Sequence, residues 1–148
     1  MKKISFLSAI FLLAVSLSSC GGGKSESTED LKKSREGFEK LIARYEVPLY
    51  SGSEFVEMGK VDNLDAAIYK TSDSADKVLE FYNNKMTELK LSAVMTSPAL
   101  PRKVNGKDVS VKFVQGVALG NDPLQIVVSM PGKKGAPEYQ MIAFAVGY

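Results

Sequence analysis

The sequence predicts an α+β fold. A mostly antiparallel sheet of five to six strands carries one long amphipathic helix on a face, preceded by an N-terminal helix. Apolar residues recur at helical spacing after Ser74, and segments beyond residue 90 alternate with the strand period between turn-forming residues. The expected order, two strands, a helix and four strands, favours an antiparallel sheet with the helix covering one face.

The first element of the expected domain is a helix over residues 31–45. Its large apolar residues recur at helical spacing: Leu31, Phe38, Leu41, Ile42 and Tyr45. Thr28 or Asp30 could cap its start, and Gly37 costs up to about 1 kcal/mol relative to Ala. We expect the apolar stripe to dock on the domain. A helix lying on a membrane is the alternative, which the balanced charges of the polar face disfavour.

Two strands and the long helix come next. The strands are expected at 54–60 and 64–71, after an extended stretch in which Pro48 keeps the preceding residue out of the helical region. Ser72-Asp73-Ser74 then offers several N-caps, and Asp76 places an anion in the first turn of the helix. The apolar face of this helix contains Val78, Phe81, Tyr82, Met86 and Leu89. We expect its aromatic rings in the core rather than around a ligand.

The rest of the chain is expected to be rich in strands. We place them at 91–97, 108–115, 124–130 and 139–146. Pro98 and Pro101 limit the first, and Asn105-Gly106 is typical of a two-residue hairpin turn because both positions tolerate positive φ. The last two are apolar on nearly both faces, which predicts central strands. The loop between them carries Lys133-Lys134, expected to be a solvated turn, with contact to anionic headgroups as the alternative.

The N-terminus has the pattern of a secretory signal over residues 1–19. Lys2 and Lys3 precede an apolar run that is shorter than the roughly 20 residues needed to span a bilayer. Residues 20–30 contain three glycines and no large apolar side chain, so we expect a flexible tether. Residues 31–148 are expected to form a single α+β domain.

The block Leu17-Ser18-Ser19-Cys20 resembles the lipobox of bacterial lipoproteins. The resemblance implies that the Cys20 thiol is alkylated with diacylglycerol, that the chain is cut before Cys20, and that the new amino group carries an acyl chain such as palmitate. Two or three acyl chains hold a protein stably on a membrane, and one does not. Gly21 stands where aspartate favours the inner membrane, so we expect the outer membrane, on its periplasmic face or surface. A free Cys20 after an ordinary signal peptide is the alternative.

A second resemblance is to a domain of small bacterial envelope lipoproteins with no known activity. Its pattern is a Pro-x-Tyr-Pro-Gly-type segment before two strands and a capped helix. The matching residues here are Pro48, Tyr50, Gly52, Asp73, Ser74, Val78, Phe81 and Tyr82. Ser51 stands where proline is usual, and no tryptophan follows the helix. The resemblance implies a fold and a cell-envelope location, without an activity.

The amino-acid composition excludes several classes of function for this chain. Without residues 1–19 the chain has 19 − 2 = 17 basic and 17 acidic residues, so the basic footprint of a nucleic-acid-binding protein is missing. There is no histidine, and Cys20 is the only cysteine. His/Cys metal sites and histidine-dependent nucleophiles are therefore excluded, and no cofactor or catalytic residue is expected.

Two carboxylate pairs are candidate sites for a cation or for acid–base chemistry. Asp62 and Asp65 flank an expected turn but lack the dense oxygen ligands of a calcium loop. Asp73 and Asp76 open the long helix, where capping explains them. Paired carboxylates also need a cleft that separates their pKa values.

The leading hypothesis is a non-catalytic, lipid-anchored cell-envelope protein that binds or stabilises another envelope component. The alternative is a carrier of a small apolar ligand held between the helix and the sheet. A small hydrolase that uses Asp, Lys, Ser or Tyr is a third hypothesis. The sequence designates no ligand-binding residue for any of them.

Overall fold

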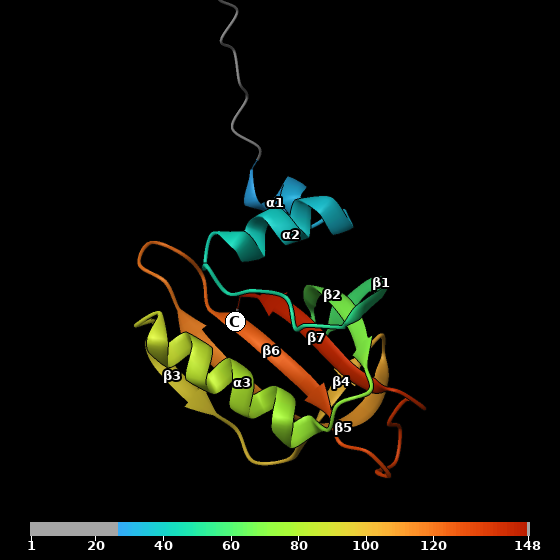
Figure 1. Ribbon diagram of the computed structural model, residues 1–148. Helices are drawn as coiled ribbons and strands as arrows, with labels where there is room; N and C mark the ends of the chain where they lie inside the picture. Colours follow the sequence, from blue (N-terminus) through green and yellow to red (C-terminus); the bar gives the residue numbers. More distant parts are fainter. Residues whose placement is uncertain (1–26, 148) are drawn as a thin grey trace, which may run out of the picture.

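The computed structural model describes residues 27–147 (Figure 1). Its elements in chain order are α1 (Thr28–Leu31), α2 (Arg35–Ala43), β1 (Glu54–Val61), β2 (Leu64–Thr71), α3 (Ala75–Glu88), β3 (Ser92–Thr96), β4 (Leu100–Val104), β5 (Lys107–Val117), β6 (Leu124–Ser129) and β7 (Gln140–Val146). The α+β class and the mostly antiparallel sheet are confirmed. The expected signal segment, the lipobox and Cys20 lie outside the described residues.

The sheet curls back on itself. Its strand order is β3-β5-β4-β1-β2-β7-β6, and β5 also pairs with β6. The path from β1 through β2, β7, β6, β5 and β4 therefore returns to β1. It closes through one Cα pair, Val61 with Val104, next to a 2.9 Å hydrogen bond from the Asn105 N–H to the Lys60 carbonyl. The six strands form a small barrel, and we call the short contact between β1 and β4 the seam.

The two faces of the sheet bury two different cores. The barrel interior receives small and branched side chains from all six ring strands: Val61, Ala66, Ile68, Val104, Val109, Val111, Val127, Met141, Ala143 and Ala145. The outer face packs against α2 and α3 through larger side chains, including Phe38, Tyr82 and Phe144. Every residue of β6 is buried, as are six of the seven in β7, which confirms the prediction that these strands are central.

The expected helix over 31–45 is two helices. Ser27 caps α1, and Ser34 caps α2 by accepting a 3.1 Å hydrogen bond from the Gly37 N–H. The chain turns between them because Gly37 lies against the backbone of Leu31, where a β-carbon would clash with the Leu31 carbonyl. The glycine thus permits a close contact between two short helices. Since α1 starts at Thr28, the last three positions of the expected tether are helical.

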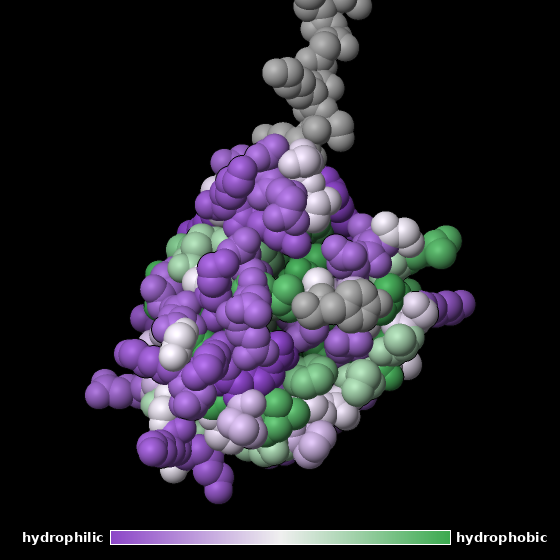
Figure 2. All heavy atoms as spheres, turned by 180° about the vertical axis from the view of Figure 1, so that it is seen from behind, coloured by the Kyte–Doolittle hydropathy of each residue, from purple (hydrophilic) through white to green (hydrophobic). Residues whose placement is uncertain are grey.

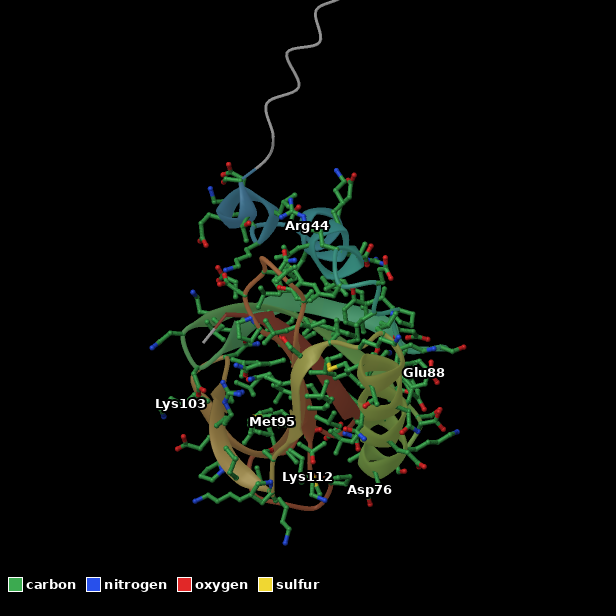
Figure 3. The ribbon with its side chains drawn as sticks, turned by 90° about the vertical axis from the view of Figure 1, so that its left-hand side faces the viewer. Arg44, Asp76, Glu88, Met95, Lys103 and Lys112 are labelled. Carbon is green, nitrogen blue, oxygen red and sulfur yellow. The ribbon has the colours of Figure 1, made fainter. Side chains whose placement is uncertain are left out.

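The long helix follows the expectation closely. Ser74 caps α3 by accepting a hydrogen bond from the Lys77 N–H at 3.4 Å. Tyr82 and Met86 are buried against the sheet, while Phe81 is partly buried. At the start of the helix, Asp76 reaches the Lys112 ammonium of β5 at 3.5 Å, and both lie at the end of the molecule away from the start of the described chain (Figure 3).

The expected strand count and order were wrong. The sheet has seven strands, not five to six, because β4 lies in the segment where Pro98 and Pro101 argued against a strand. β3 and β4 follow one another along the same edge of β5, interrupted at residues 97–99. Pro101 is tolerated in β4, and the break lets β4 leave for β1. The Asn105-Gly106 turn is confirmed, with φ values of 49° and 77°.

Candidate functional site

A small cavity opens beside the seam, where the barrel wall is incomplete. β4 ends at Val104, where the Asn105-Gly106 turn leads into β5, so among the described strands the earlier part of β1 has no partner on this edge. The loop from β6 to β7 lines the gap. The cavity has a volume of about 260 Å³. This is slightly below the ~300–1,000 Å³ typical of drug-sized ligands, so the space suits a smaller molecule.

The floor of the cavity is part of the barrel core. Ile68, Val104, Val109 and Met141 line it, each with only 1% to 6% of its surface exposed. They come from four different strands, so the floor is held by the whole barrel rather than by one hairpin. A molecule that enters here meets a rigid apolar surface.

The rim of the cavity is polar. Glu57 and Asn105 face one another across the seam, with the Asn105 Nδ2 donating to the Glu57 Oε1 at 2.8 Å. Asn105 also accepts a 2.8 Å hydrogen bond from the Lys60 N–H. This bridge fits because Gly59 has no β-carbon, which would overlap the Asn105 side chain. The Asn105 side-chain amide therefore holds β1 to the Asn105-Gly106 turn along one edge of the cavity opening.

Two further polar groups complete the rim. Lys107 lines the opening, and its ammonium has no ion pair with any residue in the described part of the chain. Tyr139 is half-buried at the start of β7, and burial, reinforced by the Glu57 carboxylate, raises the pKa of its phenol. The tyrosine is therefore a neutral hydrogen-bond donor at pH 7, and the rim offers a cation, an anion and a hydroxyl above the apolar floor.

The outer wall is the loop of residues 131–139. Gly135, Ala136 and Pro137 line the cavity. Gly135 has φ +81°, and a β-carbon there would overlap the Asp108 carbonyl oxygen. The glycine thus lets the loop lie directly on β5, closing the cavity from outside.

We expect Gly135→Ala to loosen this loop. The substitution strains a positive φ and forces the loop away from Asp108, for a loss of about 2–3 kcal/mol in unfolding free energy. Gly132→Ala is the matched control, because Gly132 has φ +69° in the same loop but no atom near its missing β-carbon, so only about 1–2 kcal/mol is expected. Urea unfolding and amide hydrogen exchange over residues 131–139 measure both. Equal effects would contradict the close docking of Gly135.

At another place on the barrel, a charged side chain takes the position of a core residue. The Arg102 side chain on β4 is only 13% exposed and donates to Asp62 Oδ2 at 2.6 Å and to Gln125 Oε1 at 2.7 Å. Its guanidinium also lies 5.5 Å from the centre of the Phe113 ring. Gln125 in turn donates to the Gly147 carbonyl at 3.1 Å. This network ties β4, β6, the β1–β2 turn and the C-terminal end together.

The two candidate carboxylate pairs, Asp62 with Asp65 and Asp73 with Asp76, do not form shared sites. Asp62 binds Arg102 and the Lys103 N–H, whereas Asp65 lies 3.0 Å from the Lys60 ammonium. Burial opposes the ionisation of Asp62, but its hydrogen bonds to the Lys103 N–H and to Arg102 lower its pKa overall.

The second pair is likewise divided. Asp73 accepts from the Tyr50 hydroxyl and from Lys77, each at 2.8 Å, and these bonds lower its pKa. Asp76 is engaged with Lys112 on the sheet. Ser74, rather than either aspartate, provides the N-cap. Within residues 27–147 no group of three or more Asp, Glu, His or Cys side chains is placed to hold a metal ion.

The aromatic residues of α3 lie in the outer core. Tyr82 packs edge-on against Phe144 and Phe81 at ring-centre distances of 5.6 and 5.0 Å. Tyr50 completes the cluster at 5.2 Å from Phe81. The space between α3 and the sheet is thus filled by side chains, and the cavity described above lies beside the seam instead of in that interface.

No pattern in the sequence marks the cavity residues as a site. Ile68, Val109 and Met141 have the pattern of ordinary strand residues, and Gly135 is one of several turn-forming residues in its loop. No helix in the described part of the chain is long and apolar enough to cross a membrane.

No family model, curated protein or solved structure matches this chain.

Proposed function

We propose that this chain is a lipid-anchored cell-envelope protein that acts without catalysis, by binding a small, mostly apolar molecule in the seam cavity. The anchor is the acylated Cys20 that the lipobox-like block implies, with the outer membrane as the expected location. The binding role rests on the cavity, which combines an apolar floor with a few polar groups, as small-molecule sites usually do.

The rim favours a ligand with one polar end. Lys107 offers a cation without an ion-pair partner in residues 27–147, and Tyr139 offers a neutral hydroxyl. A carboxylate or hydroxyl at the end of a short hydrocarbon chain would satisfy these groups while the chain covers Ile68 and Met141. Burying each methylene contributes about 0.8 kcal/mol, so a short chain is sufficient for measurable binding.

The test uses octanoate and octan-1-ol as probes of the full mature chain. Methyl resonances of Ile68, Val109 and Met141 should shift in a saturable way. Ala136→Phe, which adds a ring to the loop that lines the cavity, should abolish these ligand-induced shifts because the ring occupies the space above the floor. Ala118→Phe is the matched control, because Ala118 is also half-buried but lines a different groove. The absence of saturable shifts at the floor residues would refute the proposal.

A second candidate function is the docking of another envelope component, the leading hypothesis from the sequence. The observation that favours it is Leu119, which is fully exposed beside a groove of about 370 Å³ between the ends of α2 and α3. Contiguous exposed apolar surface is typical of interaction sites, and Leu119 shares this groove with the partly exposed Leu89 and Leu91. A photo-crosslinker at Leu119 should then yield one reproducible adduct in native envelopes. Leu89→Asp in the groove should remove it, whereas the same crosslinker at Lys134 should give none.

A further inference from the structure

A further depression lies between α1 and the β1–β2 hairpin, and lysines outnumber acids in its lining. It encloses about 580 Å³ and is lined by Lys32, Lys33, Lys60 and Lys103, against only two acids, Asp62 and Asp65. We call it the lysine groove. This excess of two positive charges applies to the lining residues alone, because the acids paired with Lys32, Lys33 and Lys103 lie just outside the lining.

Both acids of the groove are already neutralised. Asp62 is held by Arg102 from the adjoining strand, and Asp65 by Lys60 at 3.0 Å. A negatively charged ligand in the groove therefore meets Lys32, Lys33 and Lys103 without an uncompensated carboxylate beside them.

These three lysines have only weak partners. Lys32, Lys33 and Lys103 pair with Glu29, Asp30 and Asp108 at 3.3, 2.7 and 3.0 Å. The acid side chains are 76%, 60% and 76% exposed and lie outside the groove lining. The Lys33 and Lys103 pairs are exposed on both sides and contribute little to stability, whereas the Lys32 side chain is only 11% exposed. A phosphate could replace the acids at Lys33 and Lys103 at little cost.

The groove starts with Lys32 and Lys33 at the end of the molecule where the described chain begins, and it extends along the side of the barrel to Lys103 (Figure 3). α1 and α2 form this end in Figure 1, and hydrophilic residues dominate the surface around it in Figure 2. Ser27 follows Cys20 by seven positions, so the intervening chain spans at most about 25 Å. If Cys20 carries acyl chains, the groove is held close to the headgroups of the leaflet that contains them.

We propose that the lysine groove binds the phosphate headgroups of anionic lipids in that leaflet, which orients the domain on the membrane; this inference depends on the proposed lipid anchor. The lysine pair suggested from the sequence for such contact, Lys133-Lys134, is in the loop after β6 at the opposite end from α1 (Figure 1). Headgroups are therefore expected at the groove and not at that loop.

The lysines orient the domain but do not hold it alone. A lysine near an anionic surface contributes roughly fivefold in binding, so three contribute roughly a hundredfold, too little for stable attachment from solution. With the anchor in place, the tether keeps the domain at a high effective concentration near the membrane. The same hundredfold preference then decides whether the lysine groove faces the headgroups or points away from them. The orientation should weaken as salt rises.

The experiment uses the lipidated full chain made in its native host and reconstituted into vesicles. Acylation of Cys20 leaves an introduced cysteine as the only free thiol, so Asn63→Cys in the groove and Glu138→Cys in the β6–β7 loop can each carry a fluorophore. Lipids with a headgroup spin label should quench the Asn63 position severalfold more in phosphatidylglycerol-containing vesicles than in phosphatidylcholine alone. The Glu138 position should change little.

Two matched variants test the lysines. Lys32→Gln/Lys33→Gln/Lys103→Gln should remove the lipid dependence of quenching at Asn63, whereas Lys112→Gln/Lys133→Gln/Lys134→Gln, with the same net charge, should keep it. Flotation of the protein with vesicles reports separately on the anchor. Flotation without selective quenching would overturn the groove and leave the anchor, whereas a chain that does not float, with an unmodified Cys20 by mass spectrometry, would overturn both.

Discussion

Phe144→Ala should destabilise the protein by about 4 kcal/mol, the largest effect we expect from a single substitution. Phe144 is fully buried at the centre of β7, and its ring packs edge-on against Tyr69 and Tyr82 at 5.4 and 5.6 Å. Truncation would leave a cavity between α3 and the sheet and remove both ring contacts. Urea unfolding followed by circular dichroism measures the loss.

The matched control is Phe55→Ala. Phe55 contacts Tyr69 at 5.5 Å but is only partly buried on β1, so a loss of about 1–2 kcal/mol is expected. A Phe144→Ala loss no larger than that of the control would mean that the helices do not depend on β7 for their packing.

Arg102→Met should cost about 3 kcal/mol, although arginine is usually a surface residue. The methionine keeps most of the side-chain volume but leaves the buried Gln125 without its guanidinium partner, which costs about 1–3 kcal/mol. Asp62 is 43% exposed, so water replaces part of its lost ion pair and the additional cost there is smaller. Lys103→Met is the matched control on the same strand. The Lys103 pair with Asp108 is exposed on both sides, so a change within about 1 kcal/mol is expected.

The pH dependence of the unfolding free energy distinguishes the contribution of the Arg102–Asp62 ion pair from that of side-chain packing. The pKa of Asp62 is lower in the folded protein than its ordinary value, so the pair stabilises the fold above the unfolded aspartate pKa of about 3.9. That contribution is lost as the pH falls through the folded pKa. The stability gap between the native chain and Arg102→Met should therefore narrow below about pH 4. A gap that is constant from neutral pH to pH 3 would assign the effect to packing alone.

Local patterns predicted most of the elements. The helix after Ser74, the Asn105-Gly106 turn and the buried strands near the C-terminus follow from capping, turn chemistry and apolar runs, which act over a few residues. The missed strand, β4, shows where this reasoning fails. Pro101 argues against a strand locally, but β4 gains its partners from β5 and from β1, some 40 residues earlier in the chain.

The candidate sites were much less predictable. The cavity floor contains strand residues such as Ile68 and Met141, whose pattern reveals burial but not an incomplete wall. The lysine groove gathers Lys32, Lys60 and Lys103 from distant segments, and each of them alone reads as a solvated surface residue. The Arg102 network likewise depends on Gln125 lying opposite, which no local pattern encodes.

The sequence by itself determined the α+β class, the identity of most helices and strands, and the expectation of an acylated Cys20, because each depends on neighbouring residues. Only the tertiary structure decided that the sheet rolls into a barrel with an interior of its own. Side-chain periodicity tells which residues share a face but not what covers that face. The pairing of Val61 with Val104 closes the sheet into a barrel. The cavity exists because this pairing is limited to one pair of residues.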